Sequence, residues 1–362
     1  MAKYHKIPLR ITFLVASIDS GGGCRVLAHY AKGLIELGHS VVVISPPPRP
    51  YGRIKTAINY LTPSRRGQRP NHFERLGVPV NTLERYRSIK VSDIPDADVL
   101  IATWWETAIW MKNFPMSKGK KVHFVQGYEL GISPKDKIDA ALTLPIPKIT
   151  ISNWLASIVV GLNMPVPAII PNGVDGDQFA SSVRDRPKKA TVGFTYSPDP
   201  LKGVDIAIEA IQKAQVKFPD LRVVVFGHGP PALPINVANM VYMVSPDQNK
   251  LREIYSQCTA WLFPSREEGF GLPVLEALAC STPVIAFPSG AAPEILINGG
   301  GTLLKSFTAG DMADEILKYV QKSDDEWRRL SLEANKISKY FCWSESIQKF
   351  EGRLYDIFGD GK

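Results

Sequence analysis

The chain has 362 residues, a formal net charge of +8 and a hydrophobic fraction of 44%. This length predicts two domains with separate cores, and the composition is typical of globular proteins. No apolar run approaches the ~20 residues of a membrane-spanning helix. The four cysteines are too far apart for a disulfide framework or a zinc site. We therefore expect a cytoplasmic protein.

The first half opens with an apolar strand, residues 10–18, that leads into a glycine-opened helix, residues 21–39. An aspartate and three glycines follow the strand where a signal peptide would have a cleavage site, so no signal peptide is indicated. The glycines, Gly21 to Gly23, are expected at the carboxyl edge of a parallel sheet, where open α/β sheets bind ligands. A tight turn without a ligand is the alternative. Val26 breaks the G-x-G-x-x-G pattern, so no dinucleotide site is indicated.

The positive charge is concentrated in the first half. Residues 1–175 hold 22 Lys and Arg against 12 Asp and Glu, and ten of these cations fall between Arg49 and Lys90. Such a segment attracts anionic membrane surfaces, phosphorylated ligands or nucleic acid. A solvated loop is the alternative. We expect no nucleic-acid partner, and we keep an anionic membrane surface and a lipid-linked ligand as hypotheses.

Aromatic and polar residues follow two later strands of this half. Trp104 and Trp105 end one strand, and a second strand, residues 121–127, contains His123 and ends at Gln126, shortly before Glu129. Indole rings at a strand end can stack on a ring-shaped ligand, but tryptophans are at least as often part of a core. A single histidine in an apolar strand is likewise often a core residue.

The second half repeats the alternation of strands and helices. Residues 149–162 are a strand followed by a helix with Ser152 or Asn153 as N-cap, and turn residues in 170–179 mark the junction between domains. Apolar strands at 190–197, 221–229 and 282–289 then alternate with amphipathic helices. The pattern predicts an α/β fold with two Rossmann-like domains, each a parallel sheet covered by helices. We place them at 1–171 and 172–344, with a last helix at 345–362.

The segment EEGFGLPVLEAL places two carboxylates, Glu268 and Glu276, eight residues apart around a glycine turn. The glycines allow close backbone approach to a ligand, and Pro273 suits a helix start. Free N–H groups and the helix dipole there favour a diphosphate. Glu276, one turn into the helix, would then grip a ribose, and Glu268 the hydroxyls carried by the diphosphate. The combination indicates a nucleotide-sugar, whereas surface carboxylates that compensate the helix dipole are the alternative.

The order E-G-F-G-L-P-x-x-E-A-x-A, with Pro283–Ala286 and the loop 290–294 after it, resembles the donor-site signature of the family 4 (GT4-type) retaining glycosyltransferases. The run I-P-N-G-V-D-x-x-x-F, residues 170–179, resembles their interdomain connection. The resemblance implies the GT-B fold, two facing domains with the last helix packed back on the first. It also implies metal-independent, retaining transfer of a hexose from an NDP-sugar to an acceptor hydroxyl, in polysaccharide or glycolipid assembly.

The resemblance and the strand-end positions together give a set of expected site residues. The catalytic residues are Glu268, Lys202 and His123; the donor is bound by Gly22, Gly23, Lys202, Glu268, Gly269, Phe270, Gly271, Leu272 and Glu276; the acceptor is bound by Trp104, Trp105, Gln126 and Glu129. Lys202 would neutralise the diphosphate as the nucleotide leaves. We expect no cofactor and no essential metal, because the two D-x-D runs, at 96–98 and 175–177, do not follow strands.

Two positions depart from the family pattern. Ser281 stands where a glycine is usual after the helix, in left-handed geometry that costs a serine about 1 kcal/mol. Thr195 to Ser197 occupy the place of a diphosphate-binding arginine. Arg266, Lys250 or a cation from the first domain would have to replace it. Two alternatives stay open. One is an NDP-sugar hydrolase or epimerase of the same fold, which would need a stronger acid/base set, and the other, supported by the missing arginine, is a non-catalytic sugar-nucleotide or polyanion-binding protein.

Overall fold

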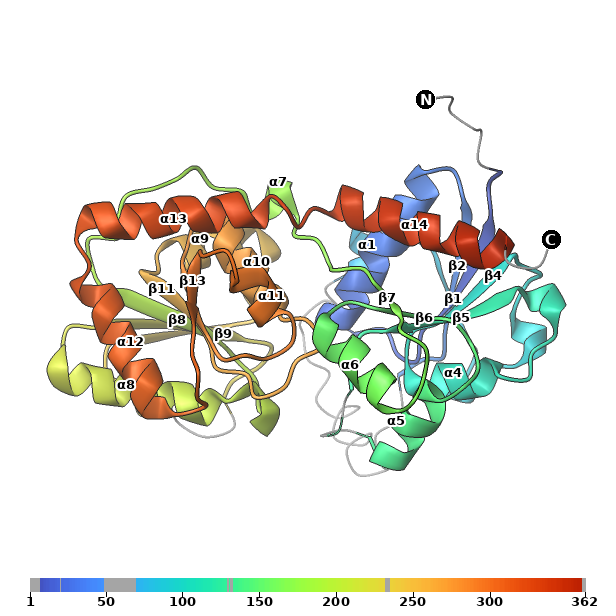
Figure 1. Ribbon diagram of the computed structural model, residues 1–362, viewed down its shortest axis with the longest axis horizontal. Helices are drawn as coiled ribbons and strands as arrows, with labels where there is room; N and C mark the ends of the chain where they lie inside the picture. Colours follow the sequence, from blue (N-terminus) through green and yellow to red (C-terminus); the bar gives the residue numbers. More distant parts are fainter. Residues whose placement is uncertain are drawn as a thin grey trace, which may run out of the picture.

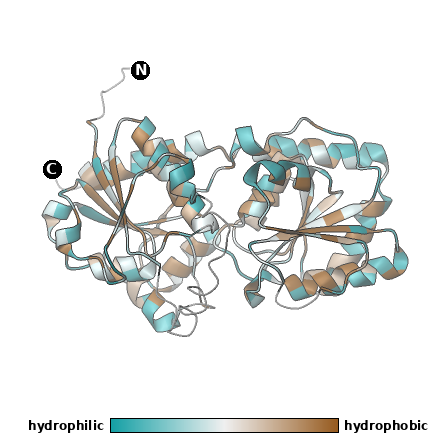
Figure 2. Cartoon of the chain, turned by 180° about the vertical axis from the view of Figure 1, so that it is seen from behind, coloured by the Kyte–Doolittle hydropathy of each residue, from teal (hydrophilic) through white to brown (hydrophobic). Residues whose placement is uncertain are grey.

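The computed structural model describes residues 7–19, 21–48, 70–128, 130, 133–231 and 235–359. These residues form two α/β domains side by side, each with one parallel sheet covered by helices (Figure 1). The predicted fold class is confirmed. Strands lie in the middle of each domain as apolar layers, and the helices turn polar faces outward (Figure 2), as parallel sheets with both faces covered require.

The first domain is built on a seven-stranded sheet in the order β3-β2-β1-β4-β5-β6-β7. Its strands are β1 Arg10–Leu14, β2 Ser40–Ser45, β3 Val80–Thr82, β4 Val99–Ala102, β5 Lys120–Val125, β6 Lys148–Thr150 and β7 Ala168–Ile169. Its helices are α1 Gly22–Glu36, α3 His72–Arg75, α4 Trp105–Met111, α5 Lys135–Leu142 and α6 Asn153–Gly161, with 3-10 turns at Val91–Asp93 and Met116–Lys118. Ser152 caps α6, because its hydroxyl accepts a bond from the N–H of Leu155.

The second domain is built on a six-stranded sheet in the order β10-β9-β8-β11-β12-β13. Its strands are β8 Thr191–Tyr196, β9 Arg222–Gly227, β10 Met240–Val244, β11 Ala260–Phe263, β12 Val284–Ala286 and β13 Gly301–Leu303. Its helices are α7 Gly176–Phe179, α8 Val204–Lys217, α9 Gln248–Ser256, α10 Leu272–Ala279, α11 Ala292–Leu296, α12 Ala309–Gln321 and α13 Asp324–Ser338, with a 3-10 turn at Pro200–Lys202.

The last helix, α14 (Trp343–Gly359), returns to the first domain and lies along α1 (Figure 1). Phe350 on α14 packs between Tyr30 and Phe124, at ring-centroid distances of 4.6 and 5.0 Å. Just before the helix, Cys342 pairs with Val174 in an isolated parallel bridge. The two chain segments that pass between the domains therefore lie side by side.

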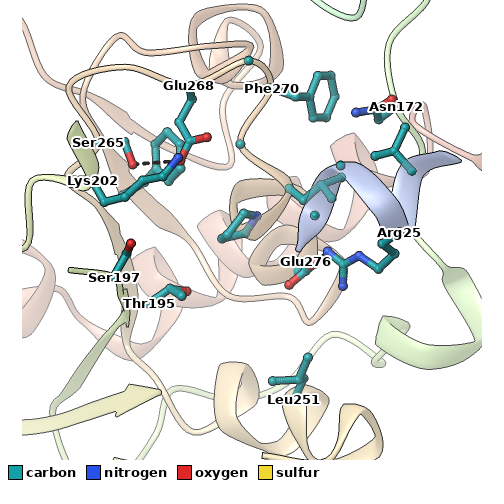
Figure 3. Close-up of a pocket in the computed structure, with 18 of the residues that line it drawn as sticks. Arg25, Asn172, Thr195, Ser197, Lys202, Leu251, Ser265, Glu268, Phe270 and Glu276 are labelled. Atoms are coloured by element: carbon teal, nitrogen blue, oxygen red, sulfur yellow. Dashed lines mark hydrogen bonds and ion pairs between the residues drawn. The ribbon is translucent and has the colours of Figure 1, made fainter. Parts of the chain in front are cut away.

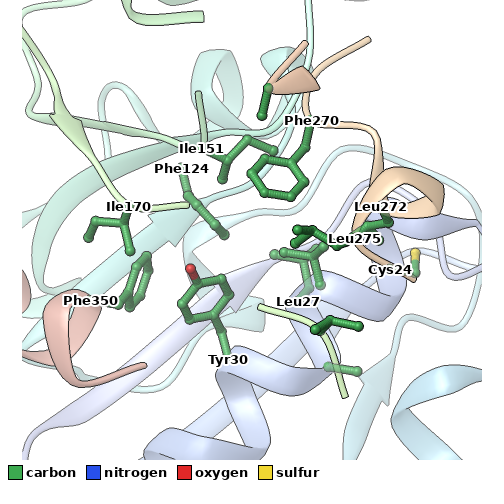
Figure 4. Close-up of a cluster of buried hydrophobic side chains, with 14 of the residues drawn as sticks. Cys24, Leu27, Tyr30, Phe124, Ile151, Ile170, Phe270, Leu272, Leu275 and Phe350 are labelled. Carbon is green, nitrogen blue, oxygen red and sulfur yellow. The ribbon is translucent and has the colours of Figure 1, made fainter. Parts of the chain in front are cut away.

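One apolar cluster contains buried side chains from both domains (Figure 4). Phe270 and Leu272 of the second domain belong to the same buried cluster as Leu27 and Ile151 of the first. The domains are thus in direct contact at the start of α10. Both sheets reverse their strand order there, at β1/β4 and β8/β11, and ligands of open α/β sheets bind outside such switch points.

Candidate donor and acceptor sites

A pocket of about 390 Å³ lies between the domains at the two switch points (Figure 3). Its walls come from the start of α1, the ends of β8 and β11, helix α9 and the turn before α10. All nine predicted donor residues line it, namely Gly22, Gly23, Lys202, Glu268, Gly269, Phe270, Gly271, Leu272 and Glu276. The structure therefore gathers into one cavity residues that are up to 254 positions apart in the chain.

The glycine turn before α10 has the geometry of an anion site. Gly271 has φ +95°, and a Cβ there would lie 2.6 Å from the ring of Phe263, so only glycine fits. Helix α10 begins at Leu272, one residue earlier than the position of Pro273 suggests. Within the described chain, the N–H groups of Phe270, Gly271 and Leu272 donate no hydrogen bond. Three free donors at a helix N-terminus form a site suited to phosphate oxygens.

Glu276 is held from both sides inside the pocket. One carboxylate oxygen contacts the guanidinium of Arg25 on α1, and the other accepts a 2.6 Å hydrogen bond from the hydroxyl of Tyr255 on α9. Glu276 and Tyr255 are both buried. Burial and the neighbouring carboxylate raise the pKa of Tyr255, so its hydroxyl keeps its proton as a donor.

Lys202 and Glu268 meet at the other end of the pocket. The ammonium of Lys202 lies 2.9 Å from Glu268 Oε1, and the hydroxyl of Ser265 donates to the same oxygen at 3.1 Å. Lys202 ends the 3-10 turn after β8, and Gly203 follows it with φ +63°. A Cβ on Gly203 would collide with the carbonyl of Pro264, so the glycine lets the lysine turn approach the Glu268 loop.

The structure selects among the cations proposed to replace the missing arginine. Thr195 to Ser197 line the pocket without a charge. Arg266 is held by Asp205, at 2.6 and 2.8 Å, and neither it nor Lys250 lines the pocket. Arg25, from the first domain, does line it. Among described residues, Arg25 and Lys202 are the arginine and lysine side chains at this cavity.

A wider pocket of about 1130 Å³ adjoins the donor pocket on the side of the first domain. Trp104, Trp105 and Gln126, predicted for the acceptor, line it, and the indole N–H of Trp105 donates to Ser133 Oγ at 2.9 Å. The two pockets share Gly23, Gln126, Lys202, Glu268 and Gly269. Ligands bound in the two pockets would therefore meet beside these shared residues.

His123 lies apart from the two large pockets. Its side chain is buried in β5 and lines a small cavity behind Trp104, Trp105 and Gln126. Within the described residues, its Nδ1 has no hydrogen-bond partner. Burial, with a smaller contribution from Lys148, lowers the pKa of His123 to about 3. The imidazole is therefore neutral near pH 7, which fits a structural or hydrogen-bonding role better than one as a proton donor.

Ser281 adopts the left-handed conformation expected of it, with φ +57°. Its hydroxyl accepts a 3.1 Å bond from the amide of Asn335 and lies 3.2 Å from Ser181 Oγ. Its carbonyl accepts a 2.8 Å bond from Ser331. These bonds tie the end of α10 to α13 and offset the backbone cost of serine in place of glycine.

Some of the predicted features lie outside the described residues. They are Glu129 and residues 49–69 of the basic segment. In the described part of that segment, Arg87 pairs with Asp93 and Glu84. No group of three or more His, Cys, Asp or Glu residues suited to a metal ion is found among the described residues. The described helices include none with the length and hydropathy of a membrane span.

Sequence reasoning did not identify Arg25, Tyr255, Ser265 or Asn172 as residues that line or support the donor pocket. Tyr255 and Ser265 hold the two glutamates, and Asn172, in the interdomain segment, is buried at the pocket with both amide atoms unpartnered within the described chain. In the sequence, Asn172 carries only the signal of a turn residue within the 170–179 junction. Tyr255 and Ser265 carry no local signal, because their partners are defined by tertiary packing.

Comparison with known proteins finds a matching family model and relatives of similar sequence. Residues 177–337 match the family model described as glycosyl transferases group 1. An uncharacterized glycosyltransferase of Methanocaldococcus jannaschii is 30% identical over 170 residues, covering 44% of this chain and 46% of that protein. A D-inositol 3-phosphate glycosyltransferase of Stackebrandtia nassauensis is 30% identical over 217 residues, covering 52% and 48%. The chain thus spans about half the length of the curated relatives it matches.

Solved structures match over nearly the whole chain. HepE of Anabaena, in complex with UDP and glucose, superposes with a TM-score of 0.73 at 17% identity, covering 96% of this chain and 99% of that one. S. aureus TarM, in a complex that includes UDP, superposes with a TM-score of 0.72 at 12% identity, covering 97% and 99%. These likenesses establish the fold. The fold implied by the resemblance is confirmed: the chain has the GT-B fold, and the family match falls on its second domain, which is similar to group 1 glycosyltransferases over residues 177–337.

Proposed function

We propose that the protein transfers a hexose from an NDP-sugar to an acceptor hydroxyl with retention of the anomeric configuration. One observation carries the proposal. The free N–H groups at the start of α10 lie between Glu276 and Glu268, in a pocket that opens into a second one at Lys202 and Gly269. Such a cavity suits a diphosphate flanked by a ribose and a sugar, with an acceptor site beside the sugar.

The described residues suit each part of that reaction. The amides of Phe270, Gly271 and Leu272 would bind the diphosphate, Glu276 the ribose diol and Glu268 the sugar hydroxyls. Lys202 would stabilise the charge that develops on the diphosphate as its bond to the anomeric carbon breaks. The acceptor oxygen would attack from the same face, and its proton would pass to the departing phosphate oxygen.

The wider pocket is the proposed acceptor site. Its tryptophans offer faces for a sugar ring, and Gln126 reaches both pockets. Its described lining carries the carboxylates Asp19, Glu106, Asp199, Glu267 and Glu268 but only one lysine, Lys202. This excess of negative charge would repel an anionic acceptor, so it supports the hydroxyl of an uncharged sugar or polyol as acceptor. An anionic or lipid-linked acceptor, or contact with a membrane surface, would depend on the Arg49–Lys90 segment, and liposome flotation with anionic lipid tests that contact.

Binding of nucleotide-sugars tests the donor site. UDP-, GDP-, ADP- and dTDP-sugars are added to the wild type and to Glu276→Ala and Lys202→Ala, and thermal unfolding is followed. We expect one nucleotide class to raise the Tm of the wild type and to raise it much less in either variant. If no nucleotide-sugar shifts the Tm, with or without a panel of acceptors, the proposed donor site is wrong.

A further inference from the structure

The contact between Arg25 and Glu276 crosses the two domains. Arg25 is the fourth residue of α1 in the first domain, and Glu276 is the fifth residue of α10 in the second. Their side chains retain 17% and 6% of their exposure, so the pair is largely removed from solvent. In Figure 3 Arg25 points from α1 toward Glu276, along the wall of the donor pocket.

Tyr255 completes the arrangement from within the second domain. Its hydroxyl occupies the other oxygen of Glu276 at 2.6 Å, and its ring is buried against Trp261 at a centroid distance of 4.4 Å. Each carboxylate oxygen has two lone pairs. Glu276 can therefore accept further hydrogen bonds while Arg25 and Tyr255 fix its orientation.

We propose that Arg25 is a positioning residue for recognition of the ribose. With Tyr255, it fixes the Glu276 carboxylate so that the remaining lone pairs face the ribose diol. The inference rests on the proposed donor site, and it adds that the first domain supplies part of the nucleotide specificity. Recognition of the ribose 2′-hydroxyl then requires the two domains to be in contact.

The ratio of the affinities for a ribonucleotide and its 2′-deoxy counterpart tests whether Arg25 positions Glu276 for the ribose. UDP, GDP, ADP and CDP and their 2′-deoxy counterparts are titrated calorimetrically against the wild type, and the pair that binds best is carried forward. We expect the wild type to prefer the ribonucleotide by about tenfold, as loss of hydrogen bonds to a charged group predicts. Arg25→Met and Tyr255→Phe should each reduce that ratio to below about threefold, and Arg25→Lys should restore part of it.

Arg10→Met is the matched control. Arg10 is also in the first domain and pairs with Asp98 at 2.9 Å, but it does not line the donor pocket. It should leave the ratio unchanged, and thermal unfolding without ligand verifies that all variants are folded.

The outcomes separate the inference from the proposed function. A wild type that binds no nucleotide overturns the proposed donor site. A wild type that binds the ribonucleotide and its 2′-deoxy counterpart equally overturns the assignment of Glu276 to the ribose, and with it the role of Arg25. A strong preference in the wild type that Arg25→Met retains overturns the role of Arg25 alone. Tighter ribonucleotide binding in Arg25→Met would overturn it too, since Arg25 would then compete with the ribose.

Discussion

The ammonium of Lys202 lies 2.9 Å from the carboxylate of Glu268, so the two side chains neutralise each other's charge. A donor would separate their tasks, because the diphosphate attracts the lysine while the sugar hydroxyls donate to the glutamate. The pair thus keeps both groups near the place where the anomeric carbon would lie. The hydroxyl of Ser265 donates to Glu268 and would keep the carboxylate in place if Lys202 turned to a diphosphate.

Substitutions at this pair should be strongly non-additive, because each single change leaves the charge of the other residue uncompensated in the pocket. Lys202→Met removes stabilisation of the leaving diphosphate, and we expect kcat to fall by about 10²–10³. Glu268→Gln should cost a comparable factor, whereas the double variant should lose much less than the product of the two. Initial rates of sugar transfer for the four proteins measure this. Fully multiplicative losses would show that the two residues act independently.

Gly269 sets how closely the domains approach. A Cβ on Gly269 would collide with the carbonyl of Gln126 in the first domain, and the carbonyl of Gly269 accepts a 2.8 Å bond from Ser152. Gly269→Ala should therefore lower kcat/KM by at least about tenfold, since displacements near 1 Å carry such costs. Gly161→Ala, where a Cβ meets nothing within 4 Å, is the control. Equal activities of the two variants would contradict this prediction.

Two histidines should make the fold sensitive to acid. Burial, and next Arg25, lower the pKa of His29 to about 4, and burial lowers that of His123 to about 3. In the unfolded chain each histidine takes up a proton near pH 6.5, whereas in the folded chain the two pKa values are far lower. The contribution of the neutral histidines to the free energy of unfolding is therefore complete above about pH 6.5 and is lost as the pH falls toward 4. His29 stacks on Trp343, so His29→Phe keeps a ring in place.

We expect the unfolding free energy of the wild type to fall between pH 7 and pH 5. His29→Phe should lose about 2 kcal/mol less over the same interval. Urea unfolding at the two pH values measures both quantities. Identical pH dependence in the two proteins would show that His29 titrates normally in the folded state.

Ser281 offers a test of backbone strain against hydrogen bonding. Ser281→Gly relieves a strain of about 1 kcal/mol but removes the hydroxyl that contacts Asn335 and Ser181. We expect little net change in Tm. Ser281→Ala keeps the strain, loses the bonds and should be less stable than Ser281→Gly by about 1 kcal/mol. Equal stabilities would mean that the left-handed conformation costs this serine nothing.

The sequence located the parts of the site that are contiguous in the chain. Glu268 to Glu276 is recognisable because one turn and one helix carry the whole set, and the apolar strands predicted both parallel sheets. The Arg25–Glu276 contact spans 251 positions, so no local pattern contains it. Strand β10 (Met240–Val244) is a continuous apolar run of five residues, but it lies at a sheet edge and is only partly buried, and it was not predicted from the sequence.

The most direct measurement follows the product of transfer by proton NMR. An α-linked NDP-sugar of the class that binds is incubated with the wild type and a panel of neutral sugar acceptors. Retaining transfer predicts a new α-anomeric signal that grows as the donor signal disappears and is greatly reduced in Lys202→Met. A β-linked product, or release of free sugar alone, would contradict the account.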